Sequence, residues 1–295
     1  MELTQEKMER HLQRLKPLLT GCSLEVARKG QEALGLLLSR SCRSRVHTES
    51  LPDYPVPCCR ILPADREPVG TILYLHGGGY TCGGLDYAKG FGSVLAAATG
   101  AAIYCPAYRL APEHPFPAAL EDALAAYRAL PERPVLCGES AGGGLIYAVC
   151  RSLLDSGSQP PLGFIAISPW TDLTASGASY KENLEKDPSM TPERLGFFAS
   201  CYTDDPQNPL VSPLLGNLEG FPPSLIFVGG NEVMLDDSRS LHKKLLSSGC
   251  QSTLEIAPGL WHGYVLYCLK ERQCDLEAIA AFAAERFGQK KFPDF

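Results

Sequence analysis

Positive charge is in short supply in this sequence. Its 295 residues carry 27 Lys and Arg against 33 Asp and Glu, which gives a formal net charge of -6. The basic residues are scattered along the chain and do not gather into a stripe. Proteins that bind nucleic acids neutralise phosphates with clustered Lys and Arg. We therefore expect no nucleic-acid partner.

Long hydrophobic segments are also lacking. The N-terminus, residues 1–7, runs directly into mixed charges and has no apolar segment of the kind that a signal peptide needs. Elsewhere the longest apolar runs fall well short of the roughly 20 residues of a membrane-spanning helix. We expect a cytoplasmic protein without a membrane partner. At 45% hydrophobic residues, the chain can still form an α/β domain with a sizeable core.

The spacings that mark metal sites are missing too. None of the 12 cysteines and 6 histidines is spaced as in a zinc site. Several cysteines, among them Cys105, Cys137 and Cys150, lie inside apolar segments of a long chain without an export signal. This setting favours reduced, buried thiols over disulfides. We expect no metal and no cofactor.

An alternation of short apolar runs with helix-like segments begins at residue 56. Repeated strand-helix pairs predict right-handed crossovers and a mostly parallel sheet with helices on both faces, so the fold class is α/β. The expected strands are residues 58–62, 71–75, 101–105, 134–137, 162–167, 225–228 and 253–256, and the expected helices are 87–99, 117–130, 144–154, 192–202, 237–247 and 274–287.

Two parts of the chain depart from this alternation. Residues 4–19 and 23–40 show helical spacing of apolar positions ahead of the first strand, and these stripes must be buried against something. Residues 171–222 are rich in Pro, Ser, Asp and Asn, and long excursions of this kind are usually lids. We expect N-terminal cap helices in 1–50, a core in 51–170 and 223–295, and a cap excursion in 171–222.

The segment Gly138-Glu139-Ser140-Ala141-Gly142 fits the G-x-S-x-G pattern between an expected strand and an expected helix. An abrupt reversal from strand to helix strains the turn residue, and small neighbours let the backbones approach. Ser140 would then stand where a general base can reach its hydroxyl, with helix N–H groups nearby for developing negative charge. The alternative is an ordinary glycine-rich turn.

Three consecutive glycines, Gly77 to Gly79, follow His76 at the end of the expected strand 71–75. A phosphate cradle would need G-x-x-x-x-G-K, or G-x-G-x-x-G with an acidic partner, and neither is present. An oxyanion hole would use the N–H groups of Gly78, Gly79 and Ala141, each worth about 3 kcal/mol in the transition state. The two motifs together favour the oxyanion hole.

In motif order, residues 55–288 resemble the hormone-sensitive lipase family of α/β-hydrolases, a group of small bacterial carboxylesterases. The resemblance implies the α/β-hydrolase fold, a helical cap made by the N-terminal helices and the 171–222 excursion, and a preference for short acyl chains. The matching segments are 76–79 (HGGG), 108–118 (YRLAPEHPFPA), 138–143 (GESAGG), 168–169 (SP), 212–214 (SPL), 231–237 and 261–263 (WHG).

Six histidines compete for the role of general base. His262 comes after the last expected strand and before the last helix, where the chain order Ser, acid, His places the base. The others are expected at the surface (His11, His47, His242), orienting the glycine loop (His76) or in a structural role (His114).

Three carboxylates follow the expected strand 225–228: Glu232, Asp236 and Asp237. The family usually has aspartate thirty residues before the histidine, and this chain has Glu232 there. A carboxylate of either kind can orient the imidazole and stabilise the imidazolium. We expect Glu232 to be the acid, with Asp236 as the alternative, while Asp236 and Asp237 also suit caps of the next helix.

The sequence thus predicts a serine carboxylic-ester hydrolase with the triad Ser140, Glu232 and His262, which forms and hydrolyses an acyl-enzyme without a cofactor. The alternative is a non-catalytic binding protein that keeps the hydrolase fold. The expected partner is a small-molecule ester, and an edge strand near the C-terminal helix favours a homodimer. Residues expected to bind substrate are Tyr80, Glu139, Trp170 and Phe198, and Glu139 is also expected to bond to the loop of Tyr108 and Arg109.

Overall fold

A computed structural model describes residues 4–288; residues 1–3 and 289–295, at the ends of the first and last predicted segments, lie outside the described residues. Its centre is an eight-stranded sheet with the order β1-β2-β4-β3-β5-β6-β7-β8. Only the pairs β1/β2 and β2/β4 are antiparallel, so the predicted mostly parallel sheet is confirmed. The strands are β1 (Val46–Leu51), β2 (Cys58–Pro63), β3 (Thr71–Leu75), β4 (Ala102–Pro106), β5 (Val135–Glu139), β6 (Gly163–Ile167), β7 (Ser224–Gly229) and β8 (Ser252–Ala257).

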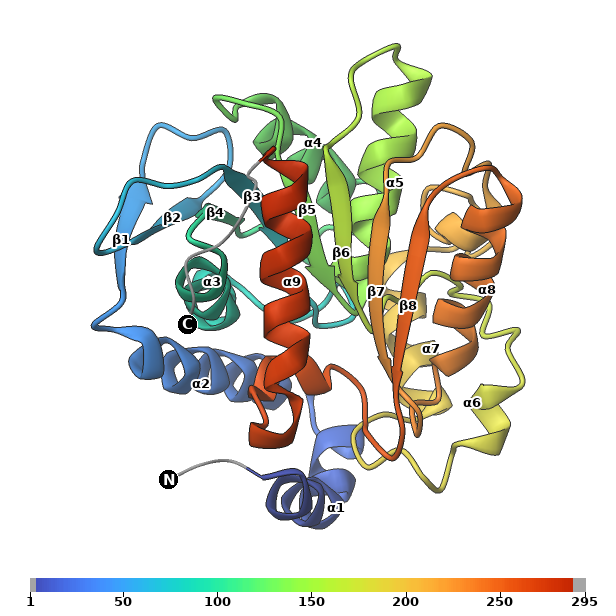
Figure 1. Cartoon of the computed structure of the whole chain (residues 1–295). Coiled ribbons are helices and arrows are strands. Elements are labelled where there is room, and N and C mark those ends of the chain that lie inside the picture. The colour runs from blue at the N-terminus through green and yellow to red at the C-terminus, as the bar shows by residue number, and fades with distance from the viewer. Residues whose placement is uncertain (1–3, 289–295) are drawn as a thin grey trace.

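Helices cover both faces of the sheet. Figure 1 shows α3 and α9 on one face and α4, α5 and α8 on the other. The α-helices are α1 (Gln5–Gly21), α2 (Leu24–Cys42), α3 (Leu85–Thr99), α4 (Ala118–Arg128), α5 (Ala141–Asp155), α6 (Ser179–Glu182), α7 (Pro192–Tyr202), α8 (Leu235–Ser247) and α9 (Gln273–Arg286).

Each central strand divides its side chains between two hydrophobic cores. In β3 all five residues are buried, and successive residues point to opposite faces of a strand. Leu73 and Leu75 pack in the core under α4, α5 and α8, whereas Ile72 and Tyr74 pack in the core under α3 and α9. A strand buried on both faces is apolar throughout, so the central strands could be predicted from continuous apolar runs in the sequence.

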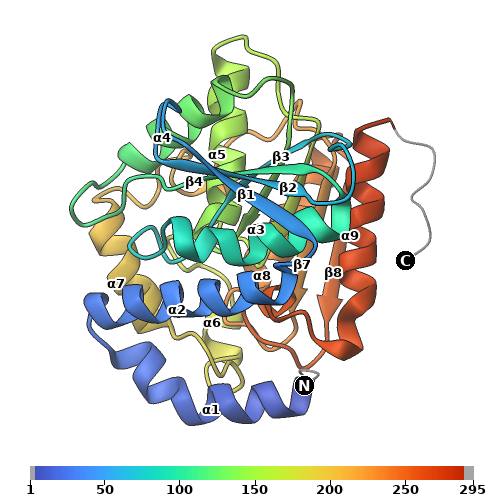
Figure 2. The same cartoon turned by 90° about the vertical axis from the view of Figure 1, so that its left-hand side faces the viewer.

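The N-terminal helices pack against both the core and the cap excursion. Helix α2 crosses α3 closely at Gly35, where an added Cβ would lie 2.2 Å from the carbonyl oxygen of Asp86. Lys16 of α1 donates a hydrogen bond to Leu184 O at 3.0 Å, and Arg194 of α7 donates to Cys22 O at 2.8 Å. Figure 2 shows α1 and α2 running below α3 beside the excursion.

The predicted boundary at residue 50, between the N-terminal cap helices and the core, falls inside strand β1. Residues 46–50, assigned to the cap helices, instead belong to β1, which pairs antiparallel with β2 from Val46↔Pro63 to Leu51↔Cys58. The strand lies at the edge of the sheet and is largely exposed, so its sequence VHTESL lacks the apolar alternation of a half-buried strand. Across residues 4–288, every helix falls short of the length or the apolar character that a bilayer crossing requires.

Candidate active site

Ser140 occupies a strained turn between β5 and α5. Its backbone has φ 52° and ψ -121°, a conformation that costs a residue with a side chain roughly 1 kcal/mol or more. Three backbone hydrogen bonds hold it: Ser140 N donates to Ile167 O at 2.9 Å, and Ser140 O accepts from Trp170 N at 2.9 Å and from Gly144 N at 3.1 Å. The predicted strand-turn-helix elbow is confirmed.

Glycines around the elbow allow backbone contacts that no other residue would permit. An added Cβ on Gly138 would lie 2.3 Å from Gly142 O, and one on Gly142 would lie 2.0 Å from Leu75 O. The second contact brings α5 against the end of β3. An added Cβ on Gly77 would lie 3.0 Å from Ser140 Cβ, so the glycine loop and the elbow are immediate neighbours.

The glycine loop presents N–H donors that have no acceptor within residues 4–288. Gly78 and Gly79 have φ angles of 115° and 61°, which favour glycine. Among the described residues, none accepts a hydrogen bond from the N–H groups of Gly78, Gly79 or Ala141. By contrast, Gly77 N donates to Glu139 Oε1 at 2.6 Å. The three N–H groups named from the sequence are therefore free to bind an anion.

His76 lies beneath this loop. Its Nδ1 lies 2.8 Å from Gly77 O, and its ring stacks on Tyr108 with centroids 4.3 Å apart. Burial lowers the pKa of His76 to about 4, so the ring is neutral near pH 7. The expected role in orienting the loop agrees with this geometry.

His262 and Glu232 form a buried hydrogen-bonded pair. His262 Nδ1 lies 2.9 Å from Glu232 Oε2, and the two side chains are 10% and 0% exposed. The other carboxylate oxygen, Oε1, accepts hydrogen bonds at 2.6 Å from Ser168 Oγ and from Gly229 N. Glu232 is thus fixed at both oxygens and holds the imidazole with one of them.

The neighbouring aspartates bind elsewhere. Asp236 Oδ2 accepts from Ser179 N at 2.9 Å, and Asp237 Oδ2 accepts from the backbone N–H groups of Thr171 and Asp172. Neither contacts His262, so the choice of Glu232 over Asp236 fits the geometry. The expected helix caps are wrong: Met234 is the N-cap of α8, and both carboxylates anchor the cap excursion to the first turn of that helix.

Charges around His262 favour its protonated form. Burial lowers the pKa of the imidazole, but the hydrogen bond to Glu232 and the charges of Glu232, Asp187 and Glu139 outweigh burial, so the pKa lies above its ordinary value. Among the described residues, no hydrogen bond joins the Ser140 hydroxyl to His262. Such bonds are often long or poorly aligned until substrate binds.

Three of the expected substrate contacts gather beside the glycine loop. An added Cβ on Gly79 would lie 2.4 Å from Phe198 Cδ2, so this ring of α7 covers the loop. Tyr80 stacks on Tyr202 at 3.8 Å and lies 6.2 Å from Trp170, measured between ring centroids. All of these rings belong to one buried hydrophobic cluster, and we call this group of rings the aromatic wall.

Glu139 has a different place from the one expected. Its carboxylate accepts hydrogen bonds from Gly77 N, from Tyr87 Oη at 2.7 Å and from Tyr74 Oη at 3.1 Å. The predicted bond to the loop of Tyr108 and Arg109 is wrong, because the Arg109 guanidinium pairs with Asp122 and Glu121. Glu139 thus supports the glycine loop through Gly77 N, and its carboxylate is surrounded by hydrogen-bond donors of the protein.

Sequence reasoning missed two residues of the site. Ser168, with φ 47°, donates to Glu232 and accepts from Gly263 N at 3.0 Å, so it joins the acid loop to the loop of His262. Its signal was the Ser-Pro pair after an expected strand. Asp187 lies in the cap excursion, which gave no periodic signal. Within residues 4–288, no group of three or more His, Cys, Asp or Glu is arranged to hold a metal ion.

Comparisons with known proteins agree with this fold. The family model described as the alpha/beta hydrolase fold matches residues 72–266. The chain belongs to this family. It is 40% identical over 234 residues to an acetyl-hydrolase of Streptomyces hygroscopicus, a match that covers 76% of this chain and 78% of the relative. An esterase of Acinetobacter venetianus is 31% identical over 75% of this chain and 77% of its own length.

Solved structures extend the family assignment to the whole architecture. An esterase from the bacterial hormone-sensitive lipase family superposes on this α/β-hydrolase with a TM-score of 0.84 at 32% identity, covering 95% of this chain and 98% of the other. A double mutant of the esterase E40 gives 0.88 at 34% identity, covering 96% and 98%. The resemblance stated from the motifs is confirmed, and with it the expectation of an enzyme, a serine hydrolase.

Proposed function

We propose that this α/β-hydrolase cleaves short-chain carboxylic esters with Ser140 as nucleophile, His262 as general base and Glu232 as the acid that orients it. The observation that carries the proposal is the buried Glu232–His262 pair, which Ser168 joins to the strained Ser140 elbow: Ser168 donates to Glu232, and its neighbour Ile167 accepts from Ser140 N. The Nδ1 of His262 is occupied by Glu232, which directs the other ring nitrogen, Nε2, to the proton of the nucleophile.

The reaction proceeds in two acyl transfers. Nε2 of His262 removes the Ser140 proton as Oγ attacks the ester carbonyl, and the oxyanion accepts from the N–H groups of Gly78, Gly79 and Ala141. The imidazolium then protonates the departing alcohol. Water, deprotonated by His262, hydrolyses the acyl-enzyme and restores the serine. The negative charges facing His262 stabilise the imidazolium formed in both steps.

The aromatic wall supports a short acyl group. Phe198 lies directly over Gly79, so the space next to the oxyanion site is bounded by a large ring of the cap. A long acyl chain would have to displace this ring or pass beside the stacked Tyr80 and Tyr202. An acetyl or butyryl group needs neither, which agrees with the name acetyl-hydrolase given to one relative.

The test compares wild type with Ser140→Ala on p-nitrophenyl esters from acetyl to dodecanoyl. We expect wild-type turnover to be greatest for short chains, and Ser140→Ala to fold normally but to lose activity and labelling by a fluorophosphonate. Ser156→Ala removes a hydroxyl from the far end of α5 and serves as the matched control. A folded Ser140→Ala variant with wild-type turnover contradicts the assignment, and a wild type with no turnover or labelling supports a binding protein.

Two further proposals concern the setting of the enzyme. All 12 cysteines are free thiols, most of them buried, which supports a reducing compartment such as the cytoplasm. Among the strands of residues 4–288, β8 pairs on one side only, with β7, and its other edge would serve a homodimer. Light scattering on purified protein tests the second proposal.

A further inference from the structure

Asp187 is a buried acid that enters the reaction scheme only as one of the charges near His262. It lies in the cap excursion between α6 and α7 and is 0% exposed. Its Oδ1 accepts from Ser189 N at 2.9 Å, Ser189 Oγ at 2.8 Å and Met190 N at 3.1 Å. Its Oδ2 accepts from Val233 N at 3.0 Å. Among the described residues no Lys or Arg pairs with it, so its hydrogen-bond donors are three backbone N–H groups and one hydroxyl.

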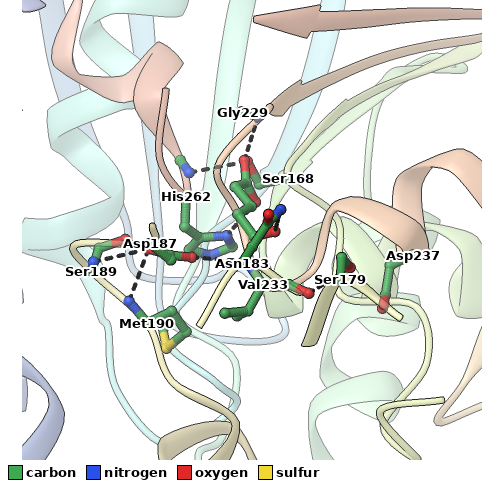
Figure 3. A network of polar contacts seen from close by, with 12 residues as sticks. Ser168, Ser179, Asn183, Asp187, Ser189, Met190, Gly229, Val233, Asp237 and His262 are labelled. Carbon is green, nitrogen blue, oxygen red and sulfur yellow. Dashed lines mark hydrogen bonds and ion pairs between the residues drawn. The ribbon is translucent and has the colours of Figure 1, made fainter. Parts of the chain in front are cut away.

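The bond to Val233 fixes the peptide immediately after Glu232. Asn183, from the same stretch of the excursion, binds the carbonyl groups of the loop that carries Glu232. Its Nδ2 donates to Glu232 O at 2.9 Å and to Gly230 O at 3.3 Å. Figure 3 shows Asp187 beside the imidazole of His262, with Asn183 and Val233 close by. The backbone that carries Glu232 is therefore held on both sides by the cap excursion.

We propose that Asp187 is a positioning residue of the hydrolase, which anchors the Glu232 loop through Val233 and presents a second carboxylate to His262. The inference rests on the proposed roles of Ser140, Glu232 and His262. It makes the 171–222 excursion part of the acid-base machinery as well as a cover for the substrate. Burying a carboxylate costs free energy, and a cap that only covered the site would not need a buried acid next to the triad.

The groups facing His262 come from four segments. Three of them carry acids that act on His262: Glu232 follows β7, Asp187 belongs to the excursion and Glu139 ends β5. The fourth carries Tyr267, on the short helix after His262, and two of the same acids, Glu139 and Asp187, act on its phenol. Burial and the charges of Glu139 and Asp187 raise the pKa of Tyr267 to about 12, so this phenol is neutral at working pH. The acids all raise the pKa of His262. Removing one of these acids should lower the pKa of His262. Activity then extends to lower pH, but the imidazole becomes a weaker base.

The decisive variant is Asp187→Asn, with Asp172→Asn as the matched control. Asp172 is also buried in the excursion and accepts from backbone and hydroxyl groups of Thr174 and Ser176, but it is not among the charges that act on His262. For Asp187→Asn we expect kcat on p-nitrophenyl acetate to fall about tenfold with little change in KM, and the acid limb of the kcat/KM profile to move down by about half a pH unit. Asp172→Asn should leave the acid limb in place.

Asp187→Glu distinguishes the effect of the negative charge from the effect of the hydrogen bond to Val233. It also tests the inference if Asp187→Asn does not fold. It retains the negative charge, so the acid limb should stay near that of wild type, while kcat falls because the longer side chain displaces the Val233 bond. Wild-type kcat in Asp187→Glu, or an acid limb in Asp187→Asn that matches wild type or Asp172→Asn, overturns the inference. The proposed function fails separately, if wild type is inactive or Ser140→Ala is not.

Discussion

The identity of the triad acid can be tested with a substitution that keeps its shape. In Glu232→Gln, the side-chain oxygen must occupy the Oε1 position, because Gly229 N–H and Ser168 Oγ–H both donate there. The amide NH2 group then faces His262 Nδ1, which accepts only when it carries no proton. The ring proton is then forced onto Nε2, the nitrogen that the proposed mechanism assigns to the Ser140 proton. His262 would be held in the tautomer that cannot act as a base.

The size of the effect follows from this tautomer. In a well-studied serine protease, the equivalent Asp→Asn change leaves the geometry intact and lowers kcat by about 10⁴. We expect Glu232→Gln to lower kcat by about 10³ to 10⁴, or about 4 to 5 kcal/mol of transition-state stabilisation. Folding should be little affected, since a buried charge is removed while its hydrogen bonds to Ser168 and Gly229 are kept.

The assay is the initial rate on p-nitrophenyl butyrate, with thermal unfolding as a check on structure. Asp236→Asn is the control, because Asp236 bonds to Ser179 and Arg239 and leaves His262 untouched. We expect it to retain activity within about threefold of wild type, as is usual for a change that touches no reacting group. A folded Glu232→Gln with more than a tenth of wild-type activity, or a large loss in Asp236→Asn, refutes the reasoning.

Two predictions concern stability. Gly142→Ala should lower the free energy of unfolding by roughly 3 kcal/mol or more, because the new Cβ would lie 2.0 Å from Leu75 O and 2.5 Å from His76 O. Gly196→Ala on α7 is the control: its Cβ would meet no atom within 4 Å, and the change should raise the free energy of unfolding by about 0.5 to 1 kcal/mol. Urea unfolding of both variants checks this, and equal effects would contradict it. Burial raises the pKa of Asp237 to about 8, so the unfolded chain loses this proton near pH 4 while the folded chain keeps it. Its contribution to stability therefore falls between about pH 4 and pH 8, and Asp237→Asn should flatten the measured slope; an unchanged slope would exclude Asp237 as its source.

The parts of the fold that the sequence predicted are those where burial decides the residue type. The central strands are buried on both faces, and strand β3 begins and ends where expected. Helix α7 also begins and ends where expected, because Thr191 caps its N-terminus and Pro192 occupies its first turn. Strand β1 was missed because, at the edge of the sheet, half of its residues are exposed and none is fully buried. The motifs located Ser140, Glu232 and His262, but the pairing of Glu232 with His262 depends on contacts between segments thirty residues apart.

The sequence could not predict the set of buried acids whose charges act on the imidazole of His262. Glu139, Asp187 and Glu232 come from three separate segments, and each accepts at least three hydrogen bonds. In the described part of the chain, none of the three pairs with Lys or Arg. A cation would neutralise the field that each carboxylate exerts, whereas neutral donors stabilise the charge locally and leave a net negative potential at His262. Neutral donors therefore explain both how these acids remain buried and why protonation of His262 in the transition state is favoured.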